Sequence, residues 1–89
     1  MRLEQLEQVV VLEKELSISK AAKVLYMTQP ALSMSLTSLE NELGIKLFER
    51  SSNGIKPTPE EQMLSCFVRG ILQDMKRLEH LHEQYINIE

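Results

Sequence analysis

The sequence predicts a mainly helical fold, with three helices, a two-stranded hairpin and a long final helix. Apolar residues recur at three- and four-residue spacing over three segments that together cover most of the chain. The dipeptide Asn53-Gly54, between two short runs, is typical of a hairpin turn. Thr28 and Thr58 each stand shortly before a proline and are expected to cap the helices that follow.

Length and composition restrict the chain to one small domain. Its 89 residues can support only a single compact core, because a chain of this size buries about 60% of its unfolded surface. The single cysteine, Cys66, excludes an intramolecular disulfide and fits a reducing compartment. It is expected to pack in the core. No apolar stretch is long enough to cross a membrane, and the N-terminus lacks the apolar core of a signal peptide. We therefore expect a cytoplasmic protein.

The first half of the chain reads as three helices. Residues 2–15 have an apolar stripe without glycine or proline. Residues 17–19 provide a break, within which Ser19 is expected to cap a short helix at 20–25. The third helix is predicted over 28–43, with Gly44 as its C-cap.

The second half reads as a hairpin and a long helix. Residues 45–50 alternate like a short strand, although their first part could equally be loop, and residues 55–58 form the return strand. The final helix, from 59 to about 85, carries apolar residues in alternating steps of four and three, which resembles a heptad pattern. A small domain cannot cover so long an apolar face, so we expect a homodimer. The residues predicted at its interface are Leu64, Val68, Ile71, Met75, Leu78 and Tyr85.

The charge is unevenly distributed. The chain carries a net charge of −3, yet segments 17–39 and 50–59 each contain two basic residues and no acidic one. Binding depends on the local field more than on the total charge, so these segments could form one face that meets an anion. The alternative is that the pattern arose by chance, because the content of basic residues in these segments is only average.

The order of these elements is that of a winged helix-turn-helix followed by a dimerisation helix. In such modules the second helix of the motif, here 28–43, enters the DNA major groove. The hairpin at 50–56 would then be the wing that reaches the backbone or the minor groove. We accordingly divide the chain into a domain at 1–58 and a linker or dimerisation helix at 59–89.

Four runs carry a family resemblance. They are Ser-Lys-Ala-Ala at 19–22, Thr-Gln-Pro-Ala-Leu-Ser at 28–33, Leu-Glu at 39–40 and Leu-Gly-Ile-Lys-Leu-Phe-Glu-Arg at 43–50. At this separation they resemble the N-terminal DNA-binding domain of LysR-type transcriptional regulators, over residues 1 to about 60. The long helix that follows is similar to the family's linker helix.

The resemblance implies a bacterial transcription regulator that binds an interrupted inverted repeat in double-stranded DNA. Such regulators act as dimers, or as tetramers in the full-length protein, and bind small-molecule effectors through a larger C-terminal domain. This sequence contains no such domain, so it is either a DNA-binding fragment with its linker helix or a naturally short protein. The rival class is a winged-helix module for protein–protein interaction, and steep weakening by salt would discriminate DNA binding from it.

The sequence departs from the family pattern in two places. Met34, Thr37 and Ser38 stand where the family often has basic or polar residues, which favours contact of Met34 or Ala31 with thymine methyl groups over guanine recognition by arginine. Residues 59–61, Pro-Glu-Glu, replace a glutamate, alanine and glycine. We expect this second change to alter the helix start and not the function.

No chemistry beyond binding is predicted. The sequence shows no nucleophile–base set, phosphate loop or paired acids, so an enzyme is not expected. His80 and His82 are two residues apart on a helix and point to different faces, so we expect no metal and no cofactor in this segment. Gln29 is the candidate for adenine recognition, and the basic residues are candidates for phosphate contacts. The predicted DNA-binding residues are Ser19, Lys20, Thr28, Gln29, Pro30, Ala31, Ser33, Met34, Thr37, Ser38, Arg50, Ser52, Asn53 and Lys56.

Overall fold

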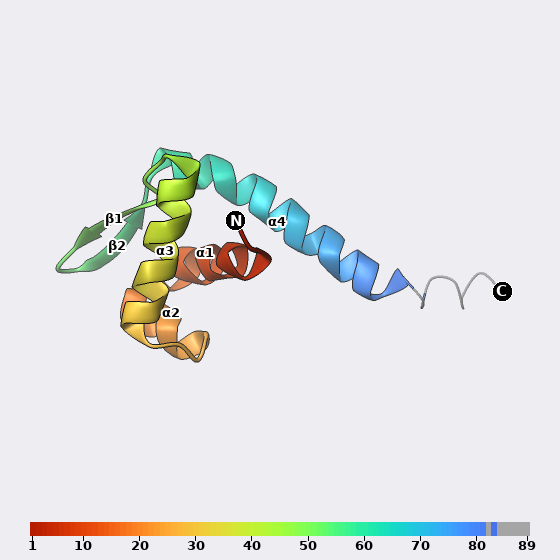
Figure 1. The fold of residues 1–89 in the computed structure, drawn as a ribbon, viewed down its shortest axis with the longest axis horizontal. Helices are drawn as coiled ribbons and strands as arrows, with labels where there is room; N and C mark the ends of the chain where they lie inside the picture. The colour runs from red at the N-terminus through yellow and green to blue at the C-terminus, as the bar shows by residue number, and fades with distance from the viewer. Residues whose placement is uncertain (82, 84–89) are drawn as a thin grey trace.

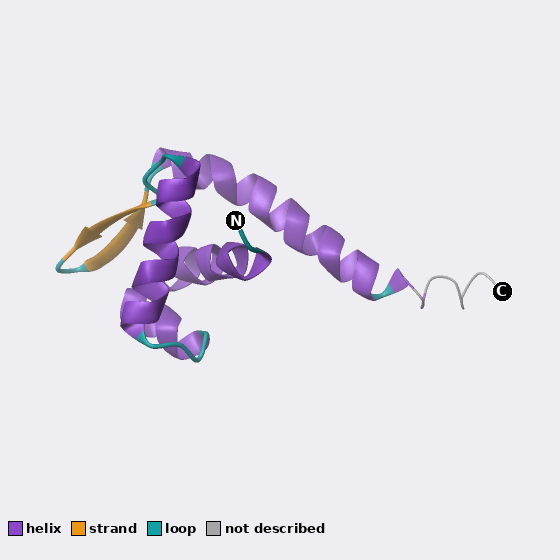
Figure 2. Ribbon diagram, viewed as in Figure 1, coloured by secondary structure: helices purple, strands orange, loops and turns teal. Residues whose placement is uncertain are grey.

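The computed structural model, which describes residues 1–81 and 83, confirms the mainly helical fold with its two-stranded wing (Figures 1 and 2). None of the described helices combines the length and apolar composition that a membrane crossing requires. In chain order the elements are α1 (Leu3–Glu15), α2 (Ile18–Val24), α3 (Gln29–Leu43), β1 (Phe48–Ser51), β2 (Gly54–Pro57) and α4 (Pro59–Glu79).

The core lies where α1, α2 and α3 meet the base of the hairpin. Helix α3 contributes one buried stripe, Leu32, Leu36 and Leu39, at three- and four-residue spacing. Ala21 and Ala22 of α2 are also buried, and their small side chains allow the neighbouring helices to approach closely. This packing leaves the opposite face of α3 exposed, and that face carries most of the predicted site.

Helix α2 begins earlier than the sequence predicted. Its N-cap is Ser17, whose Oγ accepts a hydrogen bond from the backbone N–H of Lys20 at 3.2 Å. Ser19 therefore lies inside the helix and is not its cap. Both serines are good caps, and α1 decides between them because it ends at Glu15, its C-cap Leu16 is left-handed, and Ser17 is then extended.

The hairpin is shifted by about one residue from the prediction. Ser51 pairs with Gly54, so the turn consists of Ser52 and Asn53, and Gly54 already belongs to β2. Gly54 has a φ of +124°, and a Cβ there would lie 2.6 Å from the carbonyl oxygen of Leu16. The same oxygen accepts a hydrogen bond from the N–H of Ile55 at 3.2 Å. The wing is thus fastened at its base to the link between α1 and α2.

Helix α4 begins as predicted, with Thr58 as cap and Pro59 as its first residue, but it ends at Glu79, before the predicted end near residue 85. The Oγ1 of Thr58 accepts a hydrogen bond from the N–H of Glu61 and donates one to the carbonyl oxygen of Lys46 at 2.7 Å. The helix then runs past α1 and projects from the rest of the molecule, which extends over 56 × 25 × 20 Å (Figure 1).

A buried carboxyl group lies where α4 packs on α1. Glu61 is fully buried, and neither of its carboxyl oxygens has a hydrogen-bond donor within reach. Burial, reinforced by the nearby carboxylate of Glu13, raises the pKa of Glu61 to about 8. Burial alone would also raise the pKa of Glu13, but its polar neighbours, among them the Arg69 guanidinium, hold it below its usual value. Arg69 forms an ion pair with Glu13 at 2.8 Å. At neutral pH, Glu61 is therefore largely protonated, close to an ionised Glu13.

Candidate nucleic-acid interface

The N-terminal half of α3 and the residue before it carry many of the predicted DNA-binding residues. Thr28 caps the helix by accepting a hydrogen bond from the N–H of Ala31 at 3.2 Å, and Pro30 lies in the first turn. Of residues 29–31, Pro30 has no N–H and that of Ala31 is bonded to Thr28, so this helix end offers the N–H of Gln29 and the positive end of the helix dipole. Ser33 is half-buried. The exposed candidates on and before the helix are Thr28, Gln29, Pro30, Ala31, Met34, Thr37 and Ser38.

The start of α2 contributes a second, smaller part of the candidate surface. Lys20 is exposed in the first turn of α2, while Ser19 is half-buried. Acidic residues are absent from the first turns of both α2 and α3. These two helix ends therefore keep the positive potential of their backbone dipoles.

The wing brings one predicted residue onto α3 and turns another away. Arg50 donates from Nη1 to the Oγ of Ser33 at 2.6 Å, so residues seventeen positions apart meet. In the strand register Arg50 is opposite the buried Ile55, whereas Lys56 is opposite Glu49. Directly paired residues project to the same face of a hairpin. Lys56 therefore lies on the other face from Arg50, beside an acidic side chain, and Ser52 and Asn53 are exposed at the tip.

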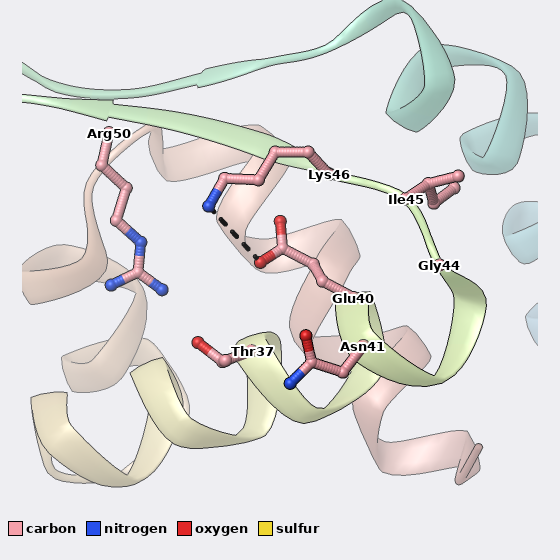
Figure 3. Close-up of a pocket in the computed structure, with 7 residues that line it drawn as sticks. All are labelled: Thr37, Glu40, Asn41, Gly44, Ile45, Lys46 and Arg50. Carbon is pink, nitrogen blue, oxygen red and sulfur yellow. Dashed lines mark ion pairs between the residues drawn. The ribbon is translucent and has the colours of Figure 1, made fainter.

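A hollow of about 570 Å³ lies between α3 on one side and, on the other, β1 with the segment that leads into it (Figure 3). Arg50 and Lys46 extend into it from the wing side, above Thr37 and Asn41 of α3. Glu40 forms its floor: its Oε2 accepts hydrogen bonds from the backbone N–H groups of Leu47 (2.7 Å) and Phe48 (3.3 Å). The Oε1 of Glu40 lies 4.0 Å from Nζ of Lys46.

Two basic residues of this surface were not predicted. Lys46 lies in the run 45–50, whose first part was predicted as either strand or loop, and outside the acid-free segments, although its position directly after the C-cap Gly44 and Ile45 placed it beside α3. Arg2 lines a second hollow on the other side of α3, together with Met34 and Ser38. The sequence signal that could have identified Arg2 was its position directly before the first helix. In the structure Arg2 forms an exposed ion pair with Glu4 at 3.1 Å.

The structure changes the predicted interface on α4. Val68 is only 1% exposed and Leu64 packs against the core, so both are used within their own chain. Met75 is half-buried, and Tyr85 lies outside the described residues. Cys66, expected in the core, is exposed. The large apolar side chains left exposed along one line of α4, which we name the α4 stripe, are Met63, Phe67, Ile71 and Leu78.

The pattern predicted a seam through Leu64 and Val68 because that line is also apolar. Only the packing of α1 shows which of the two lines is already covered. Residues 63, 67, 71 and 78 are separated by steps of four and seven, so they share one side of the helix. Phe67, which is 70% exposed, is the largest side chain of the α4 stripe.

Comparison with known proteins agrees with this architecture. The curated relatives include BenM of Acinetobacter baylyi, 34% identical over the whole chain, and DgcR of a Pseudoalteromonas species, 39% identical over 93% of it. Both are described as HTH-type transcriptional regulators. The chain spans 29% and 28% of their lengths.

Two solved structures share the fold closely. One is the BenM DNA-binding domain with catB site 1 DNA, which has a TM-score of 0.88 and 34% identity, with 97% of each chain covered. The other is the CbnR DNA-binding domain with DNA, at a TM-score of 0.90 and 28% identity, covering 97% of this chain and 99% of that one. The model of bacterial regulatory helix-turn-helix proteins of the LysR family matches residues 3–60. This chain belongs to the LysR family.

Proposed function

We propose that this chain is the sequence-specific DNA-binding domain of a bacterial LysR-type transcriptional regulator. The observation that carries the proposal is the single surface formed by the exposed face of α3 and Arg50 of the wing, which Ser33 and Arg50 join at 2.6 Å. The BenM and CbnR domains, which share this fold, were crystallised with DNA. Helix α3 would enter the major groove, and the wing at 50–56 would meet the backbone or the minor groove.

The exposed residues of α3 suggest how sequence is read. Gln29 is exposed in the first turn and has the amide geometry that pairs with adenine. Met34, 72% exposed, offers an apolar contact for a thymine methyl group. Lys20 and Arg50 would meet phosphates, and such contacts fix affinity and register but not sequence.

We further propose that two copies associate through the α4 stripe. Four large apolar side chains on one side of a projecting helix would be costly to leave in water, at roughly 25 cal/mol per Å² of apolar area. A second copy of this chain would cover the α4 stripe. It would also suit an inverted-repeat operator, because a two-fold dimer presents two α3 helices. For the whole regulator we also propose tetramer formation, effector binding and action in the cytoplasm.

Fluorescence anisotropy tests the function directly. The chain would be titrated against random duplex DNA and against a pool selected for inverted repeats, at two salt concentrations. We expect tighter binding to the selected pool and strong weakening by salt. Absence of binding to either DNA, at a concentration where the chain is dimeric, would contradict the proposal and favour the protein-interaction module.

A further inference from the structure

The junction between α1 and α4 contains carboxyl oxygens that are buried without a hydrogen-bond partner. Within the part of the chain that the structure describes, they are Oε2 of Glu13 and both carboxyl oxygens of Glu61. The side chain of Glu61 is fully buried and that of Glu13 is half-buried. A buried carboxylate without a donor has lost its water and gained nothing in exchange. The closed junction is therefore stabilised by a proton on this pair.

The first turn of α4 shows why Glu61 has no donor. Thr58 and Glu61 have the spacing of a capping box, in which the glutamate accepts a hydrogen bond from the N–H of the cap. Here the N–H of Thr58 donates instead to the carbonyl oxygen of Leu47, at 2.9 Å. Glu61 lies on the buried side of α4, in line with Ser65 and Val68.

One cation serves both carboxyl groups. Glu13 from α1 and Arg69 from α4 are the charged groups that face Glu61. Arg69 donates from Nη2 to Oε1 of Glu13 at 2.8 Å and from Nε to the Oγ of Ser65 at 3.2 Å. Strand β2 also contacts α4, but its charged residue, Lys56, is exposed. The junction therefore balances one negative charge and not two.

We propose that Glu13 and Glu61 form a proton-operated latch that docks α4 on α1. With one proton on the pair, the junction holds one carboxylate and one guanidinium and stays closed. When Glu61 loses this proton, a second carboxylate faces Glu13 in a site without donors, and the two helices separate there to admit water. The pKa of Glu61, raised to about 8 by burial and by Glu13, agrees with such a pair.

The latch opens as the pH rises. In the open junction, water reaches Glu61 and returns its pKa toward the usual 4.5. The open state then holds fewer protons than the closed state between pH 4.5 and about pH 8. Each pH unit in this range should shift the equilibrium toward the open state by up to about tenfold, and the shift should level off above the pKa of the closed state.

The latch has a consequence for DNA recognition, which rests on the proposed function. If two copies associate through the α4 stripe, the direction of α4 sets the separation of the two α3 helices. Opening of the latch would therefore make the preferred half-site spacing depend on pH.

Thiol labelling of the 89-residue chain measures opening without DNA. Val68→Cys places a thiol at a position that is 1% exposed on the docked side of α4, in a Cys66→Ser background that removes the exposed native thiol. The labelling rate with a dipyridyl disulfide, which reacts in mild acid, would be divided at each pH by the rate with Glu61→Gln added. This ratio cancels the ionisation of the thiol. It should rise by up to about tenfold per pH unit between about pH 5 and about pH 8.

Val9→Cys in the same background is the matched control for local opening. Val9 is also 1% exposed but lies in the core of α1, α2 and α3. Near pH 8 the thiol of Val68→Cys should label faster than that of Val9→Cys by about tenfold or more, because only the first is reached by local opening. Equal rates would mean that the whole domain unfolds, and would overturn the latch.

Two further outcomes decide the proposal. A ratio for Val68→Cys that stays constant between about pH 5 and about pH 8 would contradict the latch. Glu60→Gln, which changes an exposed neighbour, should leave the pH dependence of labelling intact, and its loss in that variant would also contradict the latch. Because no measurement uses DNA, failure of the latch leaves the proposed function standing, and absence of DNA binding removes only the effect on half-site spacing.

Discussion

Glu61 brings an acid into the interior of the junction between α1 and α4. The resemblance to the LysR family implies a glycine at this position, where there would be no side chain to bury. Here the carboxyl group is fully buried, without a hydrogen-bond donor, opposite Glu13. Its raised pKa, about 8, follows from that burial and from the neighbouring carboxylate.

The pH dependence of folding stability follows from this pKa. The folded state keeps a proton on Glu61 up to about pH 8, whereas the unfolded chain releases it near the usual glutamate pKa of 4.5. The stabilising contribution of that proton is complete below the unfolded pKa and is lost as the pH rises toward the folded pKa. We expect the temperature at the midpoint of thermal unfolding to decrease as the pH is raised from 5 to 8. The Glu61→Gln substitution should remove most of this decrease.

The neighbouring Glu60→Gln is the matched control, because Glu60 is exposed one position away. Its thermal midpoint should follow the wild-type profile, measured by circular dichroism. A Glu61→Gln variant with the wild-type pH profile would show that Glu61 is already ionised in the folded chain.

Specificity and affinity should be separable by single substitutions on two helices. Gln29→Ala removes a candidate base contact and should reduce the preference for the selected DNA over random DNA by about 1–3 kcal/mol. Lys20→Ala removes a candidate phosphate contact and should weaken binding to both DNAs alike. Competition assays with matched and scrambled duplexes measure the two effects. An equal loss of affinity for both DNAs in Gln29→Ala would exclude Gln29 from base recognition.

Among the elements, the wing depends on a close approach to the link between α1 and α2. Gly54 adopts a φ of +124°, a backbone conformation that residues with a side chain rarely adopt, and its Cα faces the carbonyl of Leu16. The hydrogen bond from Ile55 to the same carbonyl holds the hairpin in place. The orientation of Arg50 toward α3 therefore depends on a contact at the base of the wing.

Gly54→Ala should destabilise the fold and displace the wing. The added Cβ would lie 2.6 Å from the Leu16 carbonyl oxygen, and the backbone conformation adds about 1–3 kcal/mol. Gly44→Ala is the control, since Gly44 also has a positive φ, +71°, but has open space around it. Urea unfolding should show a larger loss of stability for Gly54→Ala. Equal losses would mean that backbone conformation alone requires the glycine.

Helix α4 presents two different sides along its length. Its side toward α1 completes the core through Val68 and forms the ion pair between Arg69 and Glu13. A neighbouring side carries the α4 stripe, which is available to a second copy. Removing everything after Glu60 would therefore damage the core together with the interface, so a point substitution is the cleaner test.

Phe67→Glu should dissociate the proposed dimer. A charge in an apolar interface is costly to desolvate, and monomers lose the gain in effective concentration that links two half-sites. Gln73→Glu adds the same charge at an exposed position outside the α4 stripe and should leave the dimer intact. Sedimentation velocity distinguishes the two states. A Phe67→Glu variant that sediments as a dimer would place the interface elsewhere.

Most of the fold was accessible to sequence reasoning because its determinants are local. Thr28 and Thr58 cap the helices that they were predicted to cap, and the apolar stripe of α3 is the buried one. The winged helix-turn-helix and the family followed from the order of elements and from four short runs. The errors concern one cap, Ser17 in place of Ser19, and a shift of about one residue in the hairpin.

Contacts between distant segments decided the remainder. Two apolar lines on α4 look alike in the sequence, and only the position of α1 shows that Val68 is covered and Phe67 is not. The burial of Glu61 and the meeting of Arg50 with Ser33 likewise depend on how whole elements pack. Periodicity and capping act within a few residues of the chain, whereas burial and partner choice depend on surfaces that exist only after the helices have packed.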